Sequence, residues 1–253
     1  MAVGTSQTVT AGHPTMRTEQ GRSMLRATTF GLIVLAAGGA MAQPASPPDG
    51  AKAAPVAMDT SKAAISTDKA QLGDRWVYEL RDEITGTIKA TRTQVITALT
   101  PNEIRVQFTS TALPKEGTFV YDRSWNLLTN TPWKYLPSDG TGVQAPLAVG
   151  KTWSFRADEV NSTTGAMLKR SGTSKILGQE TVTTRAGTFE TFKIETSYSR
   201  VSTKDPSRKV EITATGWYAP SISHWVKRNT VTRSEHLLRD KGSVELVEYR
   251  HKD

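Results

Sequence analysis

The chain has 253 residues, 22% of them charged and 37% hydrophobic, which predicts a folded domain with a sizeable core and argues against wholesale disorder. It contains no cysteine, so disulfides, thiolate nucleophiles, thiolate zinc sites and iron–sulfur clusters are excluded. The formal net charge is +8, but acidic residues interrupt the basic ones near the C-terminus, a pattern typical of a mixed solvated surface.

Residues 24–43 have the three parts of a secretory signal peptide, in the expected order. Arg26 supplies the positive region, residues 30–37 form a short apolar run, and Ala-Met-Ala at 40–42 matches the cleavage pattern. No cysteine follows that pattern, so we do not expect lipid attachment there. The sequence therefore predicts export to a periplasmic or secreted location.

The regions before and after the cleavage pattern differ in composition. Residues 1–23 are polar, so Met24 is the expected initiator within a signal region that covers 1–42. Residues 43–71 are rich in Ala and Pro and contain no aromatic residue, which predicts a disordered leader. We expect a single β domain over residues 72–253, with no transmembrane segment in the mature chain.

Alternating apolar and polar residues predict strands through most of this domain. Ile104, Val106 and Phe108 fall on one face of residues 104–109, and residues 210–214 alternate in the same way. Turn signals recur at short spacing, and no amphipathic helix of normal length is evident. The expected fold is all-β, an antiparallel sandwich or open barrel with little or no helix.

A weak internal echo raises the question of two similar halves. Residues 72–78 (Leu-Gly-Asp-Arg-Trp-Val-Tyr) resemble residues 149–155 (Val-Gly-Lys-Thr-Trp-Ser-Phe). In each copy a glycine turn starts a strand on which the Trp and a second aromatic residue share one face. Duplication and coincidence between two ordinary strands both remain open interpretations.

The catalytic motifs that a sequence can reveal are missing. The acidic pairs Asp82-Glu83 and Asp158-Glu159 are interpreted as solvated turn residues, since strand neighbours face opposite sides. For the same reason one of His224 and Trp225 is expected at the surface. We identify no catalytic residue, metal ligand or cofactor motif, so a protein without enzymatic activity is favoured.

Three aromatic residues lie in the irregular segment 121–146 and are the candidate ligand-binding residues: Trp125, Trp133 and Tyr135. Aromatic side chains on a loop can line a binding mouth. They can equally form a plug that closes one end of a barrel, which is the interpretation favoured by the usual burial of large side chains.

Several short motifs together resemble a family of bacterial exported β domains of unknown function. They are residues 146–153 (PLAVGKTW), 178–182 (GQETV), 186–194 (AGTFETFKI), 217–220 (WYAP) and 226–227 (VK). The resemblance implies an antiparallel β structure and brings no catalytic residue with it. In outline the chain is also distantly similar to open-barrel carriers of the LolA/LolB kind.

The predicted function is that of an exported, non-catalytic binding or envelope-associated protein. Its ligand could be hydrophobic or amphipathic, such as a lipid or another small molecule, and anionic envelope components are further candidate partners for the basic chain. Nucleic acid is not expected. The alternatives are a hydrolase of envelope polymers and a structural partner of another envelope protein.

Overall fold

The computed structural model describes residues 69–251, which belong to one compact unit. The predicted signal region and most of the predicted leader lie outside the described residues. The described part contains twelve strands and no helix, and so no helix that could cross a membrane. The strands are β1 (Arg75–Asp82), β2 (Ile88–Leu99), β3 (Glu103–Ser110), β4 (Gly117–Asp122), β5 (Leu127–Asn130), β6 (Trp133–Leu136), β7 (Thr152–Asn161), β8 (Met167–Thr184), β9 (Gly187–Ser202), β10 (Lys209–Ala219), β11 (His224–Ser234) and β12 (Leu237–Arg250).

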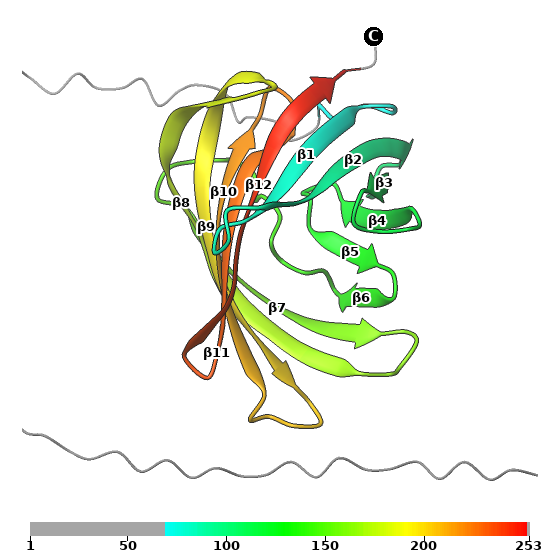
Figure 1. Cartoon of the computed structure of the whole chain (residues 1–253), viewed down its shortest axis with the longest axis vertical. Coiled ribbons are helices and arrows are strands. Elements are labelled where there is room, and N and C mark those ends of the chain that lie inside the picture. The colour runs from blue at the N-terminus through cyan, green and yellow to red at the C-terminus, as the bar shows by residue number, and fades with distance from the viewer. Residues whose placement is uncertain (1–68, 252–253) are drawn as a thin grey trace, which may run out of the picture. The chain divides into compact units, whose positions relative to one another are not determined.

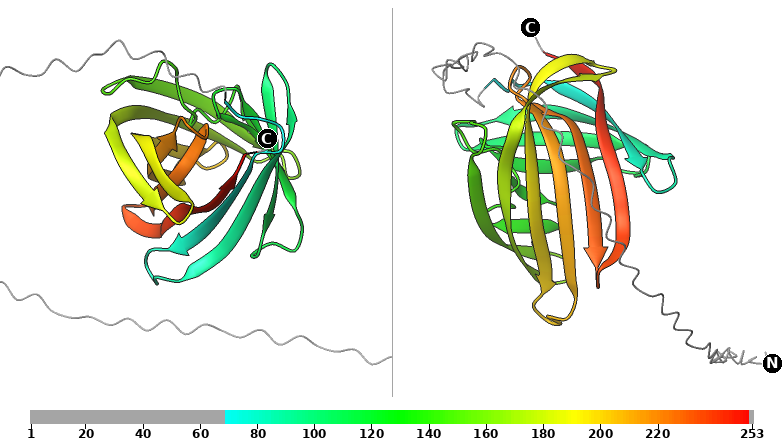
Figure 2. Two further views of the ribbon diagram at one scale, coloured as in Figure 1. Left: turned by 90° about the horizontal axis from the view of Figure 1, so that it is seen from above. Right: turned by 90° about the vertical axis from the view of Figure 1, so that its left-hand side faces the viewer.

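The strands form a closed antiparallel barrel in which each strand pairs with its neighbours in the chain (Figures 1 and 2). The remaining pairing joins β1 to β12 and completes the ring. Strands β7 to β12 are long and strongly twisted, whereas β5 and β6 have four residues each. The prediction of an all-β antiparallel fold is confirmed. Of the two predicted architectures the chain adopts the barrel, and its ring is closed.

Alternation along the strands places the core as predicted. Ile104, Val106 and Phe108 of β3 are buried, while Arg105 between them and Thr109 after them are exposed. Each strand therefore has an inner and an outer face, and residues on the inner face fill the barrel or line its cavity.

The two echoing segments begin β1 and β7 with the same local structure. Gly73 and Gly150 have positive φ angles, +92° and +87°, which glycine adopts without steric cost. The amide of Gly73 donates to the carbonyl of Ile96 (2.9 Å), and that of Gly150 donates to the carbonyl of Ile176 (2.8 Å). In β2 a register irregularity follows Ile96, and in β8 a register irregularity follows Ile176.

The hairpin tips that follow β1 and β7 also match. The amides of Gly86 and Gly165 donate to the carbonyls of Asp82 and Asn161, each at 2.8 Å. The side chains of Asp82 and Asn161 accept bonds from the next turn amides in the same pattern. The first hairpin of β1–β6 therefore repeats in β7–β12, which supports duplication over coincidence.

Connections between strands alternate between the two ends of the barrel. The end that carries the β2–β3, β4–β5, β6–β7, β8–β9 and β10–β11 connections, called here the plugged end, holds most of the large buried side chains. These include Trp76, Trp125, Trp153, Leu147 and Ile222. The opposite end carries the tips of the hairpins and exposes apolar side chains such as Ile84, Leu113 and Leu237.

The loop 137–151, between β6 and β7, folds inward and helps to fill the plugged end. Its Val143 is 1% exposed, and the amide of that residue donates to the carbonyl of Ser124 (2.8 Å). Gly142 lies so close to the β4–β5 turn that a Cβ atom there would sit 2.2 Å from the Ser124 carbonyl oxygen. Close backbone contact at this glycine therefore holds the loop in the barrel.

Candidate functional site

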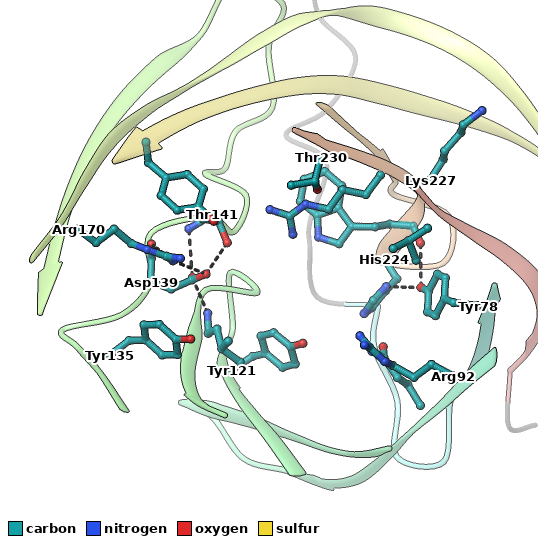
Figure 3. Close-up of a pocket in the computed structure, with 16 residues that line it drawn as sticks. Tyr78, Arg92, Tyr121, Tyr135, Asp139, Thr141, Arg170, His224, Lys227 and Thr230 are labelled. Atoms are coloured by element: carbon teal, nitrogen blue, oxygen red, sulfur yellow. Dashed lines mark hydrogen bonds and ion pairs between the residues drawn. The ribbon is translucent and has the colours of Figure 1, made fainter. Parts of the chain in front are cut away.

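A polar cavity of about 330 Å³ lies inside the barrel, beyond the apolar plug (Figure 3). Side chains from most of the ring and from the loop 137–151 contribute to its wall. The lining residues are Tyr78, Arg92, Gln94, Tyr121, Leu127, Tyr135, Asp139, Thr141, Arg170, Tyr198, His224, Trp225, Lys227, Arg228, Thr230 and Val244. The size is at the lower end of the range for small-molecule sites.

Strand alternation carries polar side chains into the cavity. On β2, Arg92 and Gln94 have the same parity as the buried Ile96, so all three face inward. Tyr78 of β1 lies directly opposite Arg92 in the register, and such cross-strand neighbours lie about 5 Å apart at Cβ. The strand pattern therefore places a cation and a phenol side by side inside the barrel.

One side of the cavity carries a balanced set of charges, all buried except that of Arg200, whose side chain is 33% exposed. Arg170 pairs with Glu159 (Nε to Oε1, 2.6 Å) and with Asp139 (Nη1 to Oδ2, 3.1 Å). Arg200 pairs with the other carboxylate oxygen of Glu159 (Nη2 to Oε2, 2.5 Å). The Glu159 side chain is fully buried, and the Arg170 and Asp139 side chains are 7% exposed. Two arginines and two carboxylates thus compensate each other.

Asp139 also fastens the inward loop to the barrel wall. Its carboxylate accepts bonds from the amide of Leu127 (2.8 Å) and the hydroxyl of Thr141 (2.5 Å). Its backbone carbonyl accepts a further bond from Arg170 (3.1 Å). These contacts hold the loop in place, so no ligand is needed to explain them.

The opposite side of the cavity has two cations without counterions. Among residues 69–251, no carboxylate lies within ion-pair distance of Arg92 or Arg228. The Arg92 guanidinium lies over the rings of Phe108 (5.6 Å) and Phe119 (5.8 Å), and its buried Nε has no hydrogen-bond partner in the described chain. Arg228 lies 6.0 Å from the ring of Trp225. The cavity therefore has an excess of positive charge.

Burial lowers the pKa of the Arg92 guanidinium, but an arginine side chain stays charged in proteins. Burial also raises the pKa values of Tyr78, Tyr121 and Tyr135, so these phenols are neutral. The Tyr78 hydroxyl donates to the Trp225 carbonyl, and those of Tyr121 and Tyr135 can donate to a ligand. The cavity thus combines fixed cations, neutral donors and aromatic faces. Such a wall is complementary to an organic anion.

His224 lies between the cavity and the plug. Its ring packs against those of Trp76 (centroids 4.4 Å apart) and Trp125 (4.5 Å, edge-on). Burial lowers the pKa of the imidazole to about 3, so the ring is neutral. A smaller recess of about 110 Å³, also lined by Tyr121 and Arg228, extends the cavity to His224 and Trp125.

The three aromatic residues singled out from the sequence have different positions. Tyr135 lines the main cavity, with the Arg170 guanidinium 5.4 Å from its ring. Trp125 is 3% exposed in the plug and lines the recess. Trp133 lines neither space and lies beside Arg200, 5.9 Å from the guanidinium.

Two sequence interpretations need correction. Glu159 is not a solvated turn residue, because Arg170 and Arg200 provide partners for its carboxylate inside the barrel. His224 and Trp225 do not divide between inside and surface, since both line the cavity. A register irregularity in the pairing of β10 with β11, next to Trp225, interrupts the simple alternation there.

Sequence reasoning missed the cationic residues of the cavity. The available signal was an arginine that falls on the apolar face of an alternating strand pattern. In residues 90–96 (ATRTQVI), Arg92 shares the face of Ile96. Lys227 belongs only to the rim, since its ammonium lies over Trp217, 5.7 Å from the ring, and points away from the cavity (Figure 3).

The fold and the cavity together define a closed antiparallel β-barrel with a cationic interior pocket. Residues 156–239 match the model of the DUF3108-like family. The match confirms, for this part of the chain, the predicted resemblance to a β-domain family of unknown function. It runs from within β7 into β12 and includes Arg170, His224 and Arg228, whereas Tyr78 and Arg92 lie outside it.

Three bacterial proteins are among the solved structures to which this chain is similar. A provisionally assigned lipoprotein from Parabacteroides distasonis is 14% identical, with a TM-score of 0.49 over 71% of this chain and 96% of the other. A provisionally assigned exported protein with a YmcC-like fold, from Bacteroides fragilis, is 14% identical (TM-score 0.46, coverage 72% and 97%). The hypothetical lipoprotein YmcC of Escherichia coli is 11% identical (TM-score 0.41, coverage 74% and 90%). No curated protein matches the sequence.

Proposed function

We propose that this protein is an exported, non-catalytic binding protein that takes up a small organic anion inside its barrel. The observation that carries the proposal is the pair Arg92 and Arg228, two cavity cations without a carboxylate partner in the described chain. Both side chains are partly buried. A charge withdrawn from water is costly unless it is paired, so the site is suited to a ligand that supplies the opposite charge.

The lining favours the amphipathic kind of ligand expected from the sequence. Tyr121, Tyr135 and Trp225 offer aromatic faces to an organic skeleton, while Arg92 and Arg228 provide the charge that binds its anionic group. A cavity of about 330 Å³ suits a compact molecule better than a lipid with two acyl chains. Export to the periplasm or beyond is supported by the signal pattern at residues 24–43.

The test is thermal unfolding of the full chain at constant ionic strength with carboxylate probes: quinate, cyclohexanecarboxylate, gluconate and hexanoate. Cyclohexanecarboxamide is the neutral control. When its concentration is about 100 times its Kd, a carboxylate that binds is expected to raise the Tm by roughly 5 °C. The amide is expected to raise the Tm by much less.

The matched variants are Arg92→Met and Arg228→Met in the cavity and Arg156→Met on an exposed position of β7. The carboxylate shift should disappear in the two cavity variants and persist in Arg156→Met. Native mass spectrometry of protein purified from its envelope fraction should show a bound acidic molecule. If no carboxylate stabilises the wild type, or if the shift survives both cavity changes, the proposal is wrong.

A further inference from the structure

The hydrogen bonds around His224 assign its two ring nitrogens to different roles. The hydroxyl oxygen of Tyr78 lies 2.8 Å from the carbonyl oxygen of Trp225 and 2.7 Å from Nδ1 of His224. A carbonyl can only accept, so the Tyr78 proton points to Trp225. Nδ1 must then carry a proton and donate it to Tyr78, which leaves Nε2 as an acceptor.

His224 cannot change this arrangement by taking up a second proton at neutral pH. Its side chain is buried among the rings of Trp76 and Trp125, and burial holds the pKa near 3. A carboxylate oxygen next to Nε2 would therefore place two acceptors against each other. That position requires a group that donates a hydrogen bond.

A second unpartnered group indicates which donor fits. Trp125 is 3% exposed and lines the same recess as His224, and its indole N–H has no partner in the described chain. An indole can only donate, whereas Nε2 of His224 can only accept. A hydroxyl group can donate to Nε2, which a carboxylate cannot, and it can also accept from an indole N–H, which an ammonium cannot.

The anion-binding side of the cavity is close to this recess. Arg92 lies opposite Tyr78 in the β1–β2 register, and Tyr78 is bonded to His224. Figure 3 shows Arg92, Tyr78 and His224 together on one side of the cavity. A ligand whose anionic group pairs with Arg92 can thus extend a neighbouring group toward His224.

We infer that the ligand is a hydroxylated organic anion, whose anionic group pairs with Arg92 while a nearby hydroxyl donates to Nε2 of His224. This inference rests on the proposed function and narrows it to one chemical class. It also gives a role to His224, which sequence analysis left without one.

The experiment compares three ring compounds by isothermal titration calorimetry with the full chain. Quinate carries a carboxylate and hydroxyls, cyclohexanecarboxylate carries the carboxylate alone, and myo-inositol carries hydroxyls alone. We expect quinate to bind at least about tenfold more tightly than cyclohexanecarboxylate, because the latter has no donor for Nε2 of His224. We expect myo-inositol to bind more weakly than either, because it has no anionic group to pair with Arg92.

His224→Phe keeps a ring in place and removes the acceptor, so it should reduce the preference for quinate to less than about twofold. His251→Phe, at a histidine outside the cavity, should keep it. If His224→Phe does not fold, the ratio of the quinate and cyclohexanecarboxylate affinities of the wild type serves as the test. Imidazole ¹⁵N NMR of the wild type, in which the Nε2 resonance of His224 should move with quinate and not with cyclohexanecarboxylate, gives a second measurement.

The outcomes separate the two proposals. Equal binding of quinate and cyclohexanecarboxylate would overturn the hydroxyl inference and leave anion binding intact. Binding of myo-inositol as tight as that of quinate would overturn both, since no anionic group would then be needed. Failure of both carboxylates to bind would also remove the proposed function and the inference together.

Discussion

Glu159 of β7 and Arg170 of β8 are diagonal neighbours in the hairpin register, and their side chains meet inside the barrel with 2.6 Å between Oε1 and Nε. The glutamate is fully buried and also holds Arg200, so its carboxylate compensates two guanidinium groups. Its neighbour Asp158 points outward and pairs with the exposed Lys169 at 2.7 Å. Two adjacent acids on one strand thus have opposite energetic roles.

Glu159→Gln should strongly destabilise the barrel, because it removes the ion-pair partner of Arg200 and one of the two carboxylate partners of the buried Arg170. We expect a loss of about 3–5 kcal/mol in the free energy of unfolding, measured by urea denaturation. Asp158→Asn is the matched control, and it should cost less than about 1 kcal/mol because its ion pair is at the surface. Similar losses for the two variants would contradict the assigned burial of Glu159.

Arg92→Met should have the opposite effect on the ligand-free protein. The change removes an interior cation without a carboxylate partner and keeps an apolar chain against Phe108 and Phe119. We expect the free energy of unfolding to rise by about 1 kcal/mol, a Tm increase of roughly 2–4 °C. Arg156→Met, on the outer surface, should change it by less than about 0.5 kcal/mol. A clear loss of stability in Arg92→Met would mean that the arginine serves the fold and not a ligand.

The buried imidazole of His224 predicts an acid-sensitive fold. Its pKa is near 3 in the folded chain and near 6.5 when exposed, so between these values only the unfolded chain binds the proton. The free energy of unfolding should therefore fall as the pH is lowered from 6.5, by up to about 1.4 kcal/mol per pH unit from this residue. Denaturant titrations between pH 7 and pH 4.5 measure the slope.

His224→Phe should reduce that slope, whereas His236→Gln, at an exposed hairpin tip, should leave it unchanged. Equal slopes in wild type and His224→Phe would show that other groups cause the acid sensitivity. The same fall in stability is expected whether or not a ligand is added, since it arises from the unfolded chain.

Gly142→Ala should displace the inward loop. A Cβ atom there would meet the backbone of Ser124 and Asn126 at 2.2 and 2.5 Å, and backbone cannot move aside as a flexible side chain can. We expect a loss of about 2 kcal/mol or more and increased fluorescence quenching of the buried Trp125. Gly178→Ala is the control, because nothing lies within 4 Å of its Cβ position. A neutral Gly142→Ala would contradict the close packing of the plug.

Much of the fold follows from local pattern, because a barrel strand has one inner face and therefore alternates. Residues 104–109 indicated their buried face correctly, and the echo of Gly73 in Gly150 indicated the matching starts of β1 and β7. Pattern could not show whether the sheet closes on itself. That depends on the pairing of β1 with β12, which no local signal encodes.

The candidate site was harder to predict because its polar residues meet through distant pairings. Glu159 finds one partner, Arg200, 41 positions along the chain. Alternation correctly placed Asp158 and Glu159 on opposite faces of the strand, but it could not show which of the two faces would be buried. Likewise, nothing local to Arg92 indicates that the facing strands bring no carboxylate to it.

Closure of the ring through β1 and β12 has a consequence for how the chain folds. Every other strand pairing joins consecutive strands, whereas Arg75 must find Arg250 across nearly the whole described sequence. Bringing these two strands together costs chain entropy. That cost becomes small enough for the pair to form only after the intervening hairpins have shortened the loop between β1 and β12. Until then β1 and β12 present free edges to other chains, so the interval before closure is when self-association is most to be expected.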